Sequence, residues 1–515
     1  ISTRDWSSDV CSSDLKFFTC CAAIALFGAM PQVRAQQPAM QTVGVELRGD
    51  TMVYRSITVP GRHPRGRAWA EYTHTPWTPE QKLFALSKLW MEVRRNFAYM
   101  DRFGVARWDS LYRAAILPAQ QTRDDIEFYR LLQRLCARLD NEQTFIRHSR
   151  NFPQTAVEFE EGWTLRLTDV GGRVTVSEVS RGKAALVPPG SEVVSVDGQP
   201  VEARLVEVME RVAASTERVR RRLAVEELLL DLIGTPHEVL FRRPDGTQTT
   251  VRLVNGRHNP ADEPETVALP GYGWRELHED FRLTWYPGEV ACLKIGSFRP
   301  GRVFRAFHDA FPEVKARARK LVIDLRWNEH GSSHMAAEFL SHLTRDTVLR
   351  GAIWRTRIYD AALASWGSDA TPADTVGNAR VKVAYEHYND AAFSDPERSE
   401  YRFPRSREIL EVPTVILIND ATGSAAECFL AIAASQPHMS TVGTTTSGGA
   451  GTVARYELLP GLWCGICTRE VRFSDGKEFV GRGIAPDVTV EASIDDLLAG
   501  RDAALERALE LLEAE

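Results

Sequence analysis

The chain contains 515 residues, of which 43% are hydrophobic and 26% are charged, and its formal net charge is −6. This length allows two to four domains with full cores, and the composition is that of a globular protein. The charge gives no electrostatic reason to expect a nucleic-acid partner. Because no window holds 18 uninterrupted apolar residues, we expect no transmembrane segment in the mature chain.

The N-terminal 35 residues are not expected to belong to the folded protein. Residues 16–35 contain the apolar core of a secretory signal peptide, which ends in Val33-Arg34-Ala35 with small residues at the expected cleavage positions. Residues 1–15 lack the basic start of a signal and resemble translated sequencing-adaptor read-through, so we exclude them from the fold. The sequence therefore predicts a secreted or periplasmic protein.

Five cysteines remain after the signal peptide, and this odd, scattered set does not form a disulfide framework. Cys464 and Cys467 make an isolated C-x-x-C motif, which can be a redox or metal site. No second C-x-x-C lies nearby, and residues three apart on a strand point to opposite faces. We therefore expect both thiols to pack in a core.

The pattern of the chain changes along its first third. Residues 36–72 are polar and arginine-rich, with one short strand-like run at 54–59, and are expected to form a loosely attached arm. Residues 73–155 carry apolar side chains at helical spacing and predict a helical domain. Its helices are expected to start near Thr78 and Thr122.

Residues 156–257 predict a small β-domain. A hairpin over 191–201 turns at Asp197-Gly198, a helical insertion follows, and two further strands close the unit. The hairpin resembles the matching hairpin of PDZ domains, which bind peptide C-termini by adding a strand to a sheet edge. A generic small β-domain is the alternative interpretation.

Residues 258–515 alternate strands with helices, which predicts an α/β unit with a largely parallel sheet. Short runs of buried-strand composition occur at 290–295, 321–325 and 415–418. Together with the helical and β-domains, they predict a multi-domain α/β protein.

The run at 415–418 leads into the most informative segment of the chain. Turn-forming residues follow the strand, and from Ala425 onward the composition is helical. Ser424 is therefore placed at or just inside a helix N-terminus, where free N–H groups and the helix dipole favour a developing oxyanion. The alternative is that Ser424 serves only as a helix N-cap.

Four stretches in order resemble the tail-specific, or C-terminal processing, serine peptidase family, whose relatives include the tricorn protease core and the interphotoreceptor retinoid-binding protein. They match the family's strand before a long helix, its D-L-R-x-N-x-G-G loop, its nucleophile segment and its closing glycine-rich motif: ACLKIGSF at 291–298, LVIDLRWNEHG at 321–331, NDATGSAAE at 419–427 and FSDGKEFVGRGIAPDVTV at 473–490. The resemblance covers residues 73–490. It implies a peptidase core with PDZ-like and helical domains, which acts on peptide or unfolded protein substrates without a cofactor.

The resemblance also implies roles for individual residues. Ser424 corresponds to the nucleophile, and the N–H groups of Ala425 and Gly331 would form the oxyanion hole. Losing one such donor typically costs about 3 kcal/mol of transition-state stabilisation. Asp324 and Arg326 are expected to form a structural pair that holds the loop.

The general base is left open by the resemblance. Processing peptidases of the family carry a lysine where this chain has Gly449, and tricorn-like members carry a histidine on the strand where this chain has Lys294. The D-G-H-T motif of the helical domain is Asn-Glu-Gln-Thr here, from Asn141. Lys294 is a candidate if burial lowers its pKa toward neutrality, and His330 has an ordinary pKa that already suits a base. We favour His330, because the adjacent Gly331 should face the reacting carbonyl.

Three functions are compatible with these residues. The leading interpretation is a secreted or periplasmic serine endopeptidase that cleaves unstructured or C-terminal protein segments through Ser424. The rival is a non-catalytic member of the fold that binds peptides or small apolar ligands. An esterase would need a G-x-S-x-G elbow, but Ala426 replaces its last glycine. His330 and His334 are four residues apart without a third ligand in view, so we expect no metal site.

Overall fold

The computed structural model describes residues 45–48, 51–55, 76–148, 158–256, 265–277 and 279–514. The predicted signal peptide at 16–35 and the excluded residues 1–15 lie outside these ranges. Within them, no helix has both the length and the apolar character needed to cross a membrane.

An eight-stranded sheet forms the centre of the region that the sequence predicts to be a peptidase core, here called the peptidase part. Its five strands from β13 to β22 run parallel. Its spatial order is β1 (Val45–Arg48), β2 (Thr51–Arg55), β12 (Phe281–Tyr286), β13 (Val290–Ile295), β14 (Lys320–Asp324), β17 (Thr414–Ile418), β18 (Met439–Gly443) and β22 (Val488–Thr489). Every residue of β13 and β17 is buried, as expected for strands covered on both faces. The predicted α/β class is confirmed.

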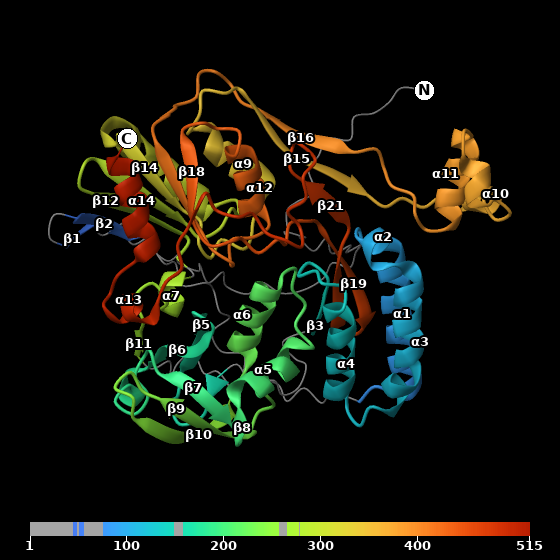
Figure 1. Ribbon diagram of the computed structural model, residues 1–515, viewed down its shortest axis with the longest axis horizontal. Coiled ribbons are helices and arrows are strands. Elements are labelled where there is room, and N and C mark those ends of the chain that lie inside the picture. The colour runs from blue at the N-terminus through green and yellow to red at the C-terminus, as the bar shows by residue number, and fades with distance from the viewer. Residues whose placement is uncertain are drawn as a thin grey trace, which may run out of the picture.

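Helices cover both faces of this sheet (Figure 1). One face packs against α8 (Arg302–Arg317), α9 (Ser333–Ser341) and α12 (Ala425–Ala433), and the other packs against α14 (Ala503–Glu513). The parallel pairing of β14 with β17 brings their carboxyl ends to the same edge. The loop that follows β14 therefore meets the turn that follows β17, and this meeting point carries the candidate site.

The described part of the N-terminal arm, residues 45–48 and 51–55, pairs with the central sheet. The strand expected at 54–59 overlaps β2 at residues 54 and 55, and its remaining residues lie outside the described ranges. β1 and β2 form an antiparallel pair, and β2 pairs with β12 at the edge of the central sheet. An edge strand exposes unpaired N–H and C=O groups, so an extended segment that binds there gains backbone hydrogen bonds.

The helical domain consists of α1 (Pro79–Asn96), α2 (Met100–Phe103), α3 (Val105–Gln121) and α4 (Asp125–Ala137). Thr78 caps α1 as predicted, in a capping box with Gln81. The start predicted near Thr122 is wrong by two residues, because Asp124 accepts a hydrogen bond from the Glu127 N–H and caps α4 instead.

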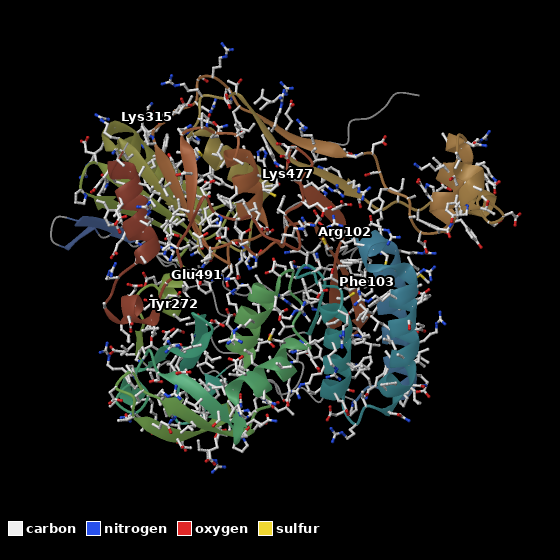
Figure 2. All side chains as sticks on the ribbon, in the orientation of Figure 1. Arg102, Phe103, Tyr272, Lys315, Lys477 and Glu491 are labelled. Atoms are coloured by element: carbon white, nitrogen blue, oxygen red, sulfur yellow. The ribbon has the colours of Figure 1, made fainter. Side chains whose placement is uncertain are left out.

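The helical domain shares its core with the peptidase part. After α4, strand β3 (Phe145–His148) pairs with β20 (Leu462–Cys467) of the hairpin formed with β19 (Val453–Leu459). Cys464 and Cys467 are fully buried in this shared core, as expected. At the other end lies Arg102 on α2, which is labelled in Figure 2. It forms ion pairs with Glu470 and Glu478.

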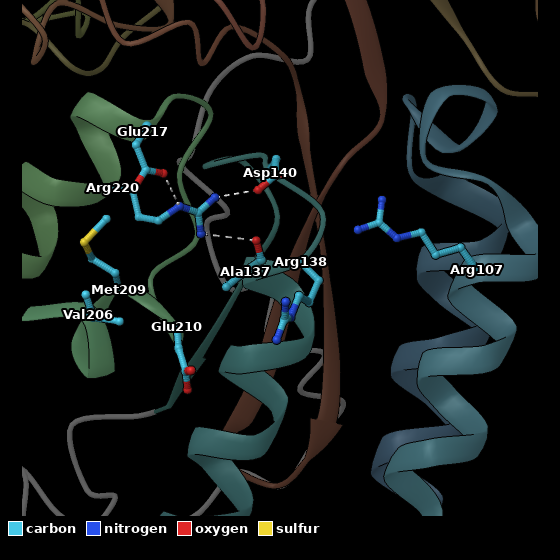
Figure 3. A pocket seen from close by; sticks show the side chains of 9 residues that line it. All are labelled: Arg107, Ala137, Arg138, Asp140, Val206, Met209, Glu210, Glu217 and Arg220. Atoms are coloured by element: carbon cyan, nitrogen blue, oxygen red, sulfur yellow. Dashed lines mark hydrogen bonds and ion pairs between the residues drawn. The ribbon is translucent and has the colours of Figure 1, made fainter. Parts of the chain in front are cut away.

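The β-domain has six strands in line, with β5 and β8 paired beside them. Its elements are β4 (Glu158–Phe159), β5 (Leu165–Val170), β6 (Arg173–Ser180), β7 (Glu192–Val196), β8 (Gln199–Pro200), α5 (Val201–Met209), α6 (Glu217–Glu227), β9 (Pro236–Arg242), β10 (Gln248–Gly256) and β11 (Thr266–Ala268). The predicted hairpin is confirmed: β7 pairs with β8, and Asp197 and Gly198 both have positive φ at its turn. Arg220 on α6 links this domain to the helical domain, because it donates hydrogen bonds to Ala137 and Asp140 (Figure 3).

A ribbon of β15 (Val348–Thr356) and β16 (Glu397–Arg402), joined by β21 (Arg469–Arg472), extends from the peptidase part. Its tip carries α10 (Ala361–Trp366) and α11 (Ala379–Tyr388), which project away from the rest of the molecule (Figure 1). Two short helices, α7 (Trp274–Leu277) and α13 (Ile494–Leu498), lie near the β-domain.

Candidate active site

Ser424 stands at the N-cap of α12, as predicted, but it does not behave as a cap. Its side chain makes no capping hydrogen bond, and its backbone has φ 53° and ψ −112°. Positive φ is uncommon for a residue other than glycine, and such strain concentrates at functional sites. Among the described residues, the half-buried Ser424 hydroxyl has no hydrogen-bond partner. The alternative role of a simple N-cap is therefore not what the structure shows.

The turn before Ser424 is fixed to the loop after β14. The Thr422 hydroxyl donates to the Leu325 carbonyl over 3.0 Å, and the Gly423 N–H donates to the Asn328 carbonyl over 3.0 Å. The Asn328 side chain in turn donates to the Ile295 carbonyl at the end of β13. The strands that position the site are thus connected through their own loops.

Gly331 is required by this loop. The Phe298 N–H donates to the His330 carbonyl, and the Ser332 N–H donates to the Phe298 carbonyl, each over 2.9 Å. Gly331 has φ +143°, and a Cβ there would lie 2.3 Å from the Phe298 carbonyl carbon. No L-residue fits so close to another backbone.

Two cavities meet at Ser424. The larger, here called the large cleft, has a volume of about 830 Å³ and lies among the helical domain, α6 of the β-domain and the peptidase part. The smaller, here called the small pocket, has a volume of about 60 Å³ and is lined by both Gly331 and Ala425. Within the described residues, the N–H groups of Gly331 and Ala425 have no acceptor. The predicted oxyanion donors are therefore free and adjacent to Ser424.

His330 lies in the large cleft with Ser424. Its side chain is 59% exposed, and its Nε2 lies 3.9 Å from the Glu329 carboxylate. Partial burial lowers the pKa of His330, and the charges of Arg299 and Arg147 lower it further, whereas Glu329 opposes them. At neutral pH the imidazole is therefore mostly uncharged and able to accept a proton.

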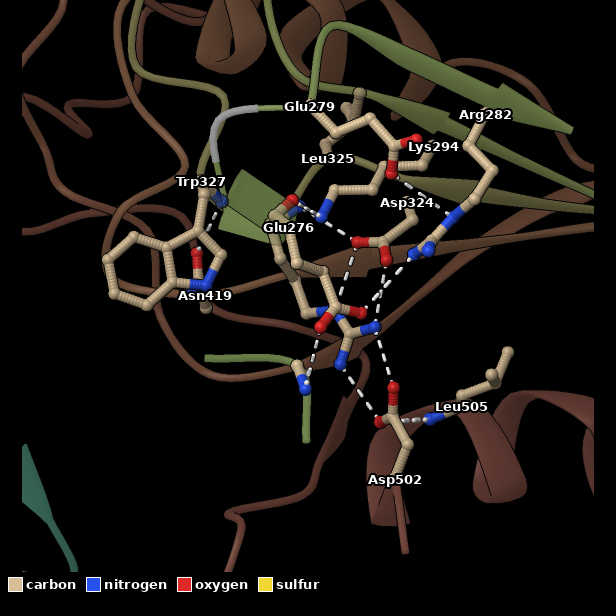
Figure 4. A network of polar contacts seen from close by, with 12 residues as sticks. Glu276, Glu279, Arg282, Lys294, Asp324, Leu325, Trp327, Asn419, Asp502 and Leu505 are labelled. Carbon is tan, nitrogen blue, oxygen red and sulfur yellow. Dashed lines mark hydrogen bonds and ion pairs between the residues drawn. The ribbon is translucent and has the colours of Figure 1, made fainter. Parts of the chain in front are cut away.

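Lys294, the other predicted base, is not brought to Ser424. Its Nζ donates to the Glu276 carbonyl over 2.6 Å in a separate cavity, where it faces Asp324 (Figure 4). Burial lowers the pKa of Lys294, and the Asp324 carboxylate opposes this effect. Neighbouring side chains on a strand alternate between faces, and this one points toward the far cavity.

Asp324 and Arg326 form the expected structural pair. The Arg326 guanidinium donates to both Asp324 oxygens, at 2.9 and 2.8 Å, and also to both oxygens of Asp502 at the N-cap of α14. Arg326 keeps the pKa of the Asp324 carboxyl low despite burial. The pair anchors the loop that carries Gly331.

Glu142 is a site residue that the sequence did not predict. It lines the large cleft with Ser424, and the Ser447 hydroxyl donates to its Oε1 over 3.2 Å. A Cβ on Gly449 would lie 1.6 Å from this oxygen, so Glu142 occupies the space where the family's lysine would begin. Burial raises the pKa of Glu142 to about 6, although Arg222 lowers it.

Glu427 lies one helical turn after Ser424 and supports the neighbouring loop. It accepts hydrogen bonds from the Thr446 hydroxyl and from the N–H groups of Gly448 and Gly449. Burial raises the pKa of Glu427 to about 8, and the charge of Glu142 contributes. The sequence analysis gave Glu427 no role, although it is the last residue of the NDATGSAAE stretch at 419–427, because its burial is visible only in the fold.

Comparison with known proteins bears on this geometry. Residues 289–490 match the sequence profile described as peptidase family S41. Residues 289–490 belong to peptidase family S41. The S41 domain makes the chain a serine-type peptidase, and the predicted family is confirmed.

Solved structures show the same fold. Mature CPAF has a TM-score of 0.65 and 16% identity, and the match covers 84% of this chain and 96% of that one. CPAF complexed with lactacystin has a TM-score of 0.63 and 16% identity, with 84% and 97% covered. No curated protein sequence matches the chain. In the described part of the chain, no three His, Cys, Asp or Glu side chains are grouped to hold a metal ion.

Proposed function

We propose that the chain is an endopeptidase in which Ser424 attacks the carbonyl carbon of an extended peptide. The observation that carries this proposal is the strained, uncapped Ser424 beside two free backbone N–H groups. The hydroxyl oxygen forms a bond to the carbonyl carbon and gives its proton to a nearby acceptor. The oxyanion is held by the N–H groups of Gly331 and Ala425. Collapse then breaks the C–N bond, and the amine leaves with a proton from the same acceptor, which leaves an ester on Ser424. Water, deprotonated by that acceptor, attacks the ester carbonyl, and the C–O bond to Ser424 breaks to release the acid and restore the hydroxyl.

Two groups in the large cleft can accept that proton. His330 is the predicted acceptor, and its imidazole is neutral at pH 7 for the reasons above. Glu142 is half-buried close to Gly423 and reaches the site through Ser447, and its carboxyl is largely ionised at pH 7. The role of Lys294 as the base has no geometric support, because Lys294 lines a separate cavity with Asp324 and not the large cleft.

The substrate is proposed to be an unstructured or C-terminal protein segment. The large cleft is bordered by Arg222 and Leu223 of α6, so the β-domain forms one wall of the path to Ser424. We propose that this PDZ-like domain guides an extended chain into the cleft, and that the signal-like residues 16–35 direct the protein to a secreted or periplasmic location.

A fluorophosphonate probe tests the nucleophile directly. The purified protein should be labelled at Ser424, and Ser424→Ala purified in parallel should not be labelled. Hydrolysis of casein by the wild-type chain alone should accompany the labelling. A folded wild-type protein that is neither labelled nor active would instead support the rival function, a peptide-binding member of the fold.

A further inference from the structure

Arg469 places a positive charge in the small pocket beside Ser424. It lies on β21, is half-buried, and its guanidinium carbon lies 3.8 Å from the ring centre of Trp354. No carboxylate in the described residues pairs with it. The adjacent Glu470 is committed elsewhere, because it forms ion pairs with Arg355, Arg102 and Arg472. Arg469 is therefore held in place but not neutralised.

The rest of the small pocket is uncharged. No acidic side chain lines it. Its wall consists of small residues and two aromatic rings, and includes Gly331, Ser333, Gly351, Trp354, Tyr401 and Cys428. A half-buried guanidinium in such a setting lacks the partner that would offset its desolvation. A carboxylate from outside the chain would supply that partner, through a bidentate contact.

The large cleft, which Ser424 also lines, likewise contains arginines without acidic partners. Its acidic lining residues are already engaged: Glu142 with Ser447, Glu227 with Arg211, and Glu329 with Arg222. Three exposed arginines of its lining have no acidic partner in the described residues: Arg147, Arg299 and Arg455.

Two of these arginines are pre-positioned by aromatic rings. Arg147 lies over Phe145, and Arg455 lies over Trp463. Ordered side chains lose less entropy when they bind a ligand. The chain as a whole has a net charge of −6, so this local excess of positive charge is specific to the site.

We propose that the peptidase selects acidic peptide segments, and that Arg469 binds the carboxylate side chain of the residue whose carbonyl is attacked. This rests on the proposed function of Ser424. The small pocket is lined by both oxyanion donors, Gly331 and Ala425, so it is the cavity nearest to the bound carbonyl. The side chain of that residue is attached to its Cα atom, which is bonded directly to the attacked carbonyl carbon. Arg147, Arg299 and Arg455 would bind acidic residues further along the peptide.

The test compares peptides that differ at one position. A quenched fluorescent peptide carries Glu, Gln or Lys on the carbonyl side of a single cleavable bond, with the flanking residues neutral. For the wild-type chain we expect kcat/KM for Glu to exceed that for Gln by about tenfold or more, and Lys to be poorest. Peptides with Glu at flanking positions should gain further, and that gain should fall as salt is added.

Variants separate charge from shape. Arg469→Gln should equalise the Glu and Gln peptides, and Arg469→Lys should keep part of the preference. Arg113→Gln is the matched control, since Arg113 is exposed on α3 away from both cavities and should leave every ratio unchanged. Fluorophosphonate labelling of Ser424 reports whether each variant still folds around its site.

The outcomes distinguish the two proposals. Labelling and cleavage with no preference for Glu over Gln would overturn the acidic selection and leave the nucleophile intact. Preference for Glu that persists in a labelled Arg469→Gln protein would overturn the role of Arg469. Absence of both labelling and cleavage of every peptide would overturn the proposed function itself.

Discussion

Arg222, on helix α6 of the β-domain, donates a hydrogen bond of 3.1 Å to Glu329, two residues before Gly331, the proposed oxyanion donor. Its guanidinium also pairs with Glu226 and lies 4.0 Å from Asp420, in the turn before Ser424. The β-domain therefore contacts both loops of the site through one buried side chain. The domain that we propose to guide substrate would thus also support the proposed oxyanion hole.

Replacement of Arg222 should reveal the proton acceptor. Arg222 lowers the pKa of Glu142, so Arg222→Gln should raise that pKa and move the acid limb of kcat/KM to higher pH if Glu142 accepts the proton. The matched change is Arg299→Gln, which should raise the pKa of His330 and move the limb only if His330 accepts it. We also expect Arg222→Gln to lower kcat/KM about tenfold, because the oxyanion loop loses a contact. The dependence of kcat/KM on pH in the two variants shows which group accepts the proton. If the acid limb moves in neither variant, both Glu142 and His330 are excluded as the acceptor.

Direct removal of each candidate acceptor gives an independent test. His330→Ala or Glu142→Gln should lower kcat/KM by about a hundredfold or more, depending on which group takes the proton. Lys294→Met should leave kcat/KM within about threefold in the folded protein, because Lys294 lies in the far cavity. A collapse of both activity and Ser424 labelling in a folded Lys294→Met protein would restore the Ser-Lys mechanism.

Substitution at Ser424 should separate chemistry from strain. Ser424→Ala should abolish casein hydrolysis and leave the thermal midpoint nearly unchanged, because it removes the nucleophile and keeps the strained backbone. Ser424→Gly should be equally inactive but more stable than Ser424→Ala by about 1 kcal/mol, since glycine adopts positive φ without a penalty. Denaturant unfolding of the two variants measures this difference, and equal stabilities would contradict the strain argument.

Glu427 should make stability depend on pH. Its pKa is raised from an ordinary 4.5 to about 8, so between these values the native state keeps a proton that the unfolded chain has lost. Stability should therefore fall as pH rises from about 5 to 8 and level off above that. Thermal midpoints across this range should slope downward in the wild-type chain and less steeply in Glu427→Gln. The same slope in both proteins would show that Glu427 ionises normally.

Gly449 should not tolerate a side chain while Glu142 is present. A Cβ at 449 would lie 1.6 Å from the Glu142 carboxylate oxygen, so Gly449→Ala must displace that carboxylate and should lower both activity and the thermal midpoint. Glu142→Ala in the same chain should recover part of the lost stability. A double-mutant cycle of thermal midpoints measures this coupling, and additive effects would argue against the contact.

The parts of the site that were predictable are local in sequence. Strand, turn and helix signals around Ser424 lie within twenty residues, and the glycine at 331 belongs to a recognisable motif. Lys294 was misplaced because the face of a strand depends on its register, which no local pattern fixes. Glu142 escaped notice because it reaches the site from the helical domain, through the pairing of β3 with β20. The attachment of β2 to the sheet edge is another long-range contact of this kind.

The contact between Arg326 and Asp502 has a consequence for the order of events during synthesis. Asp502 follows every residue of the site along the chain. Its carboxylate accepts hydrogen bonds from the Arg326 guanidinium, which also anchors the loop that carries Gly331. A nascent chain that has not yet exposed residue 502 lacks that anchor, even when Ser424 is already outside the ribosome. We therefore expect the Ser424 site to react poorly until residue 502 has emerged and α14 can form. Probe labelling of ribosome-bound chains stalled before and after residue 502 would measure this delay.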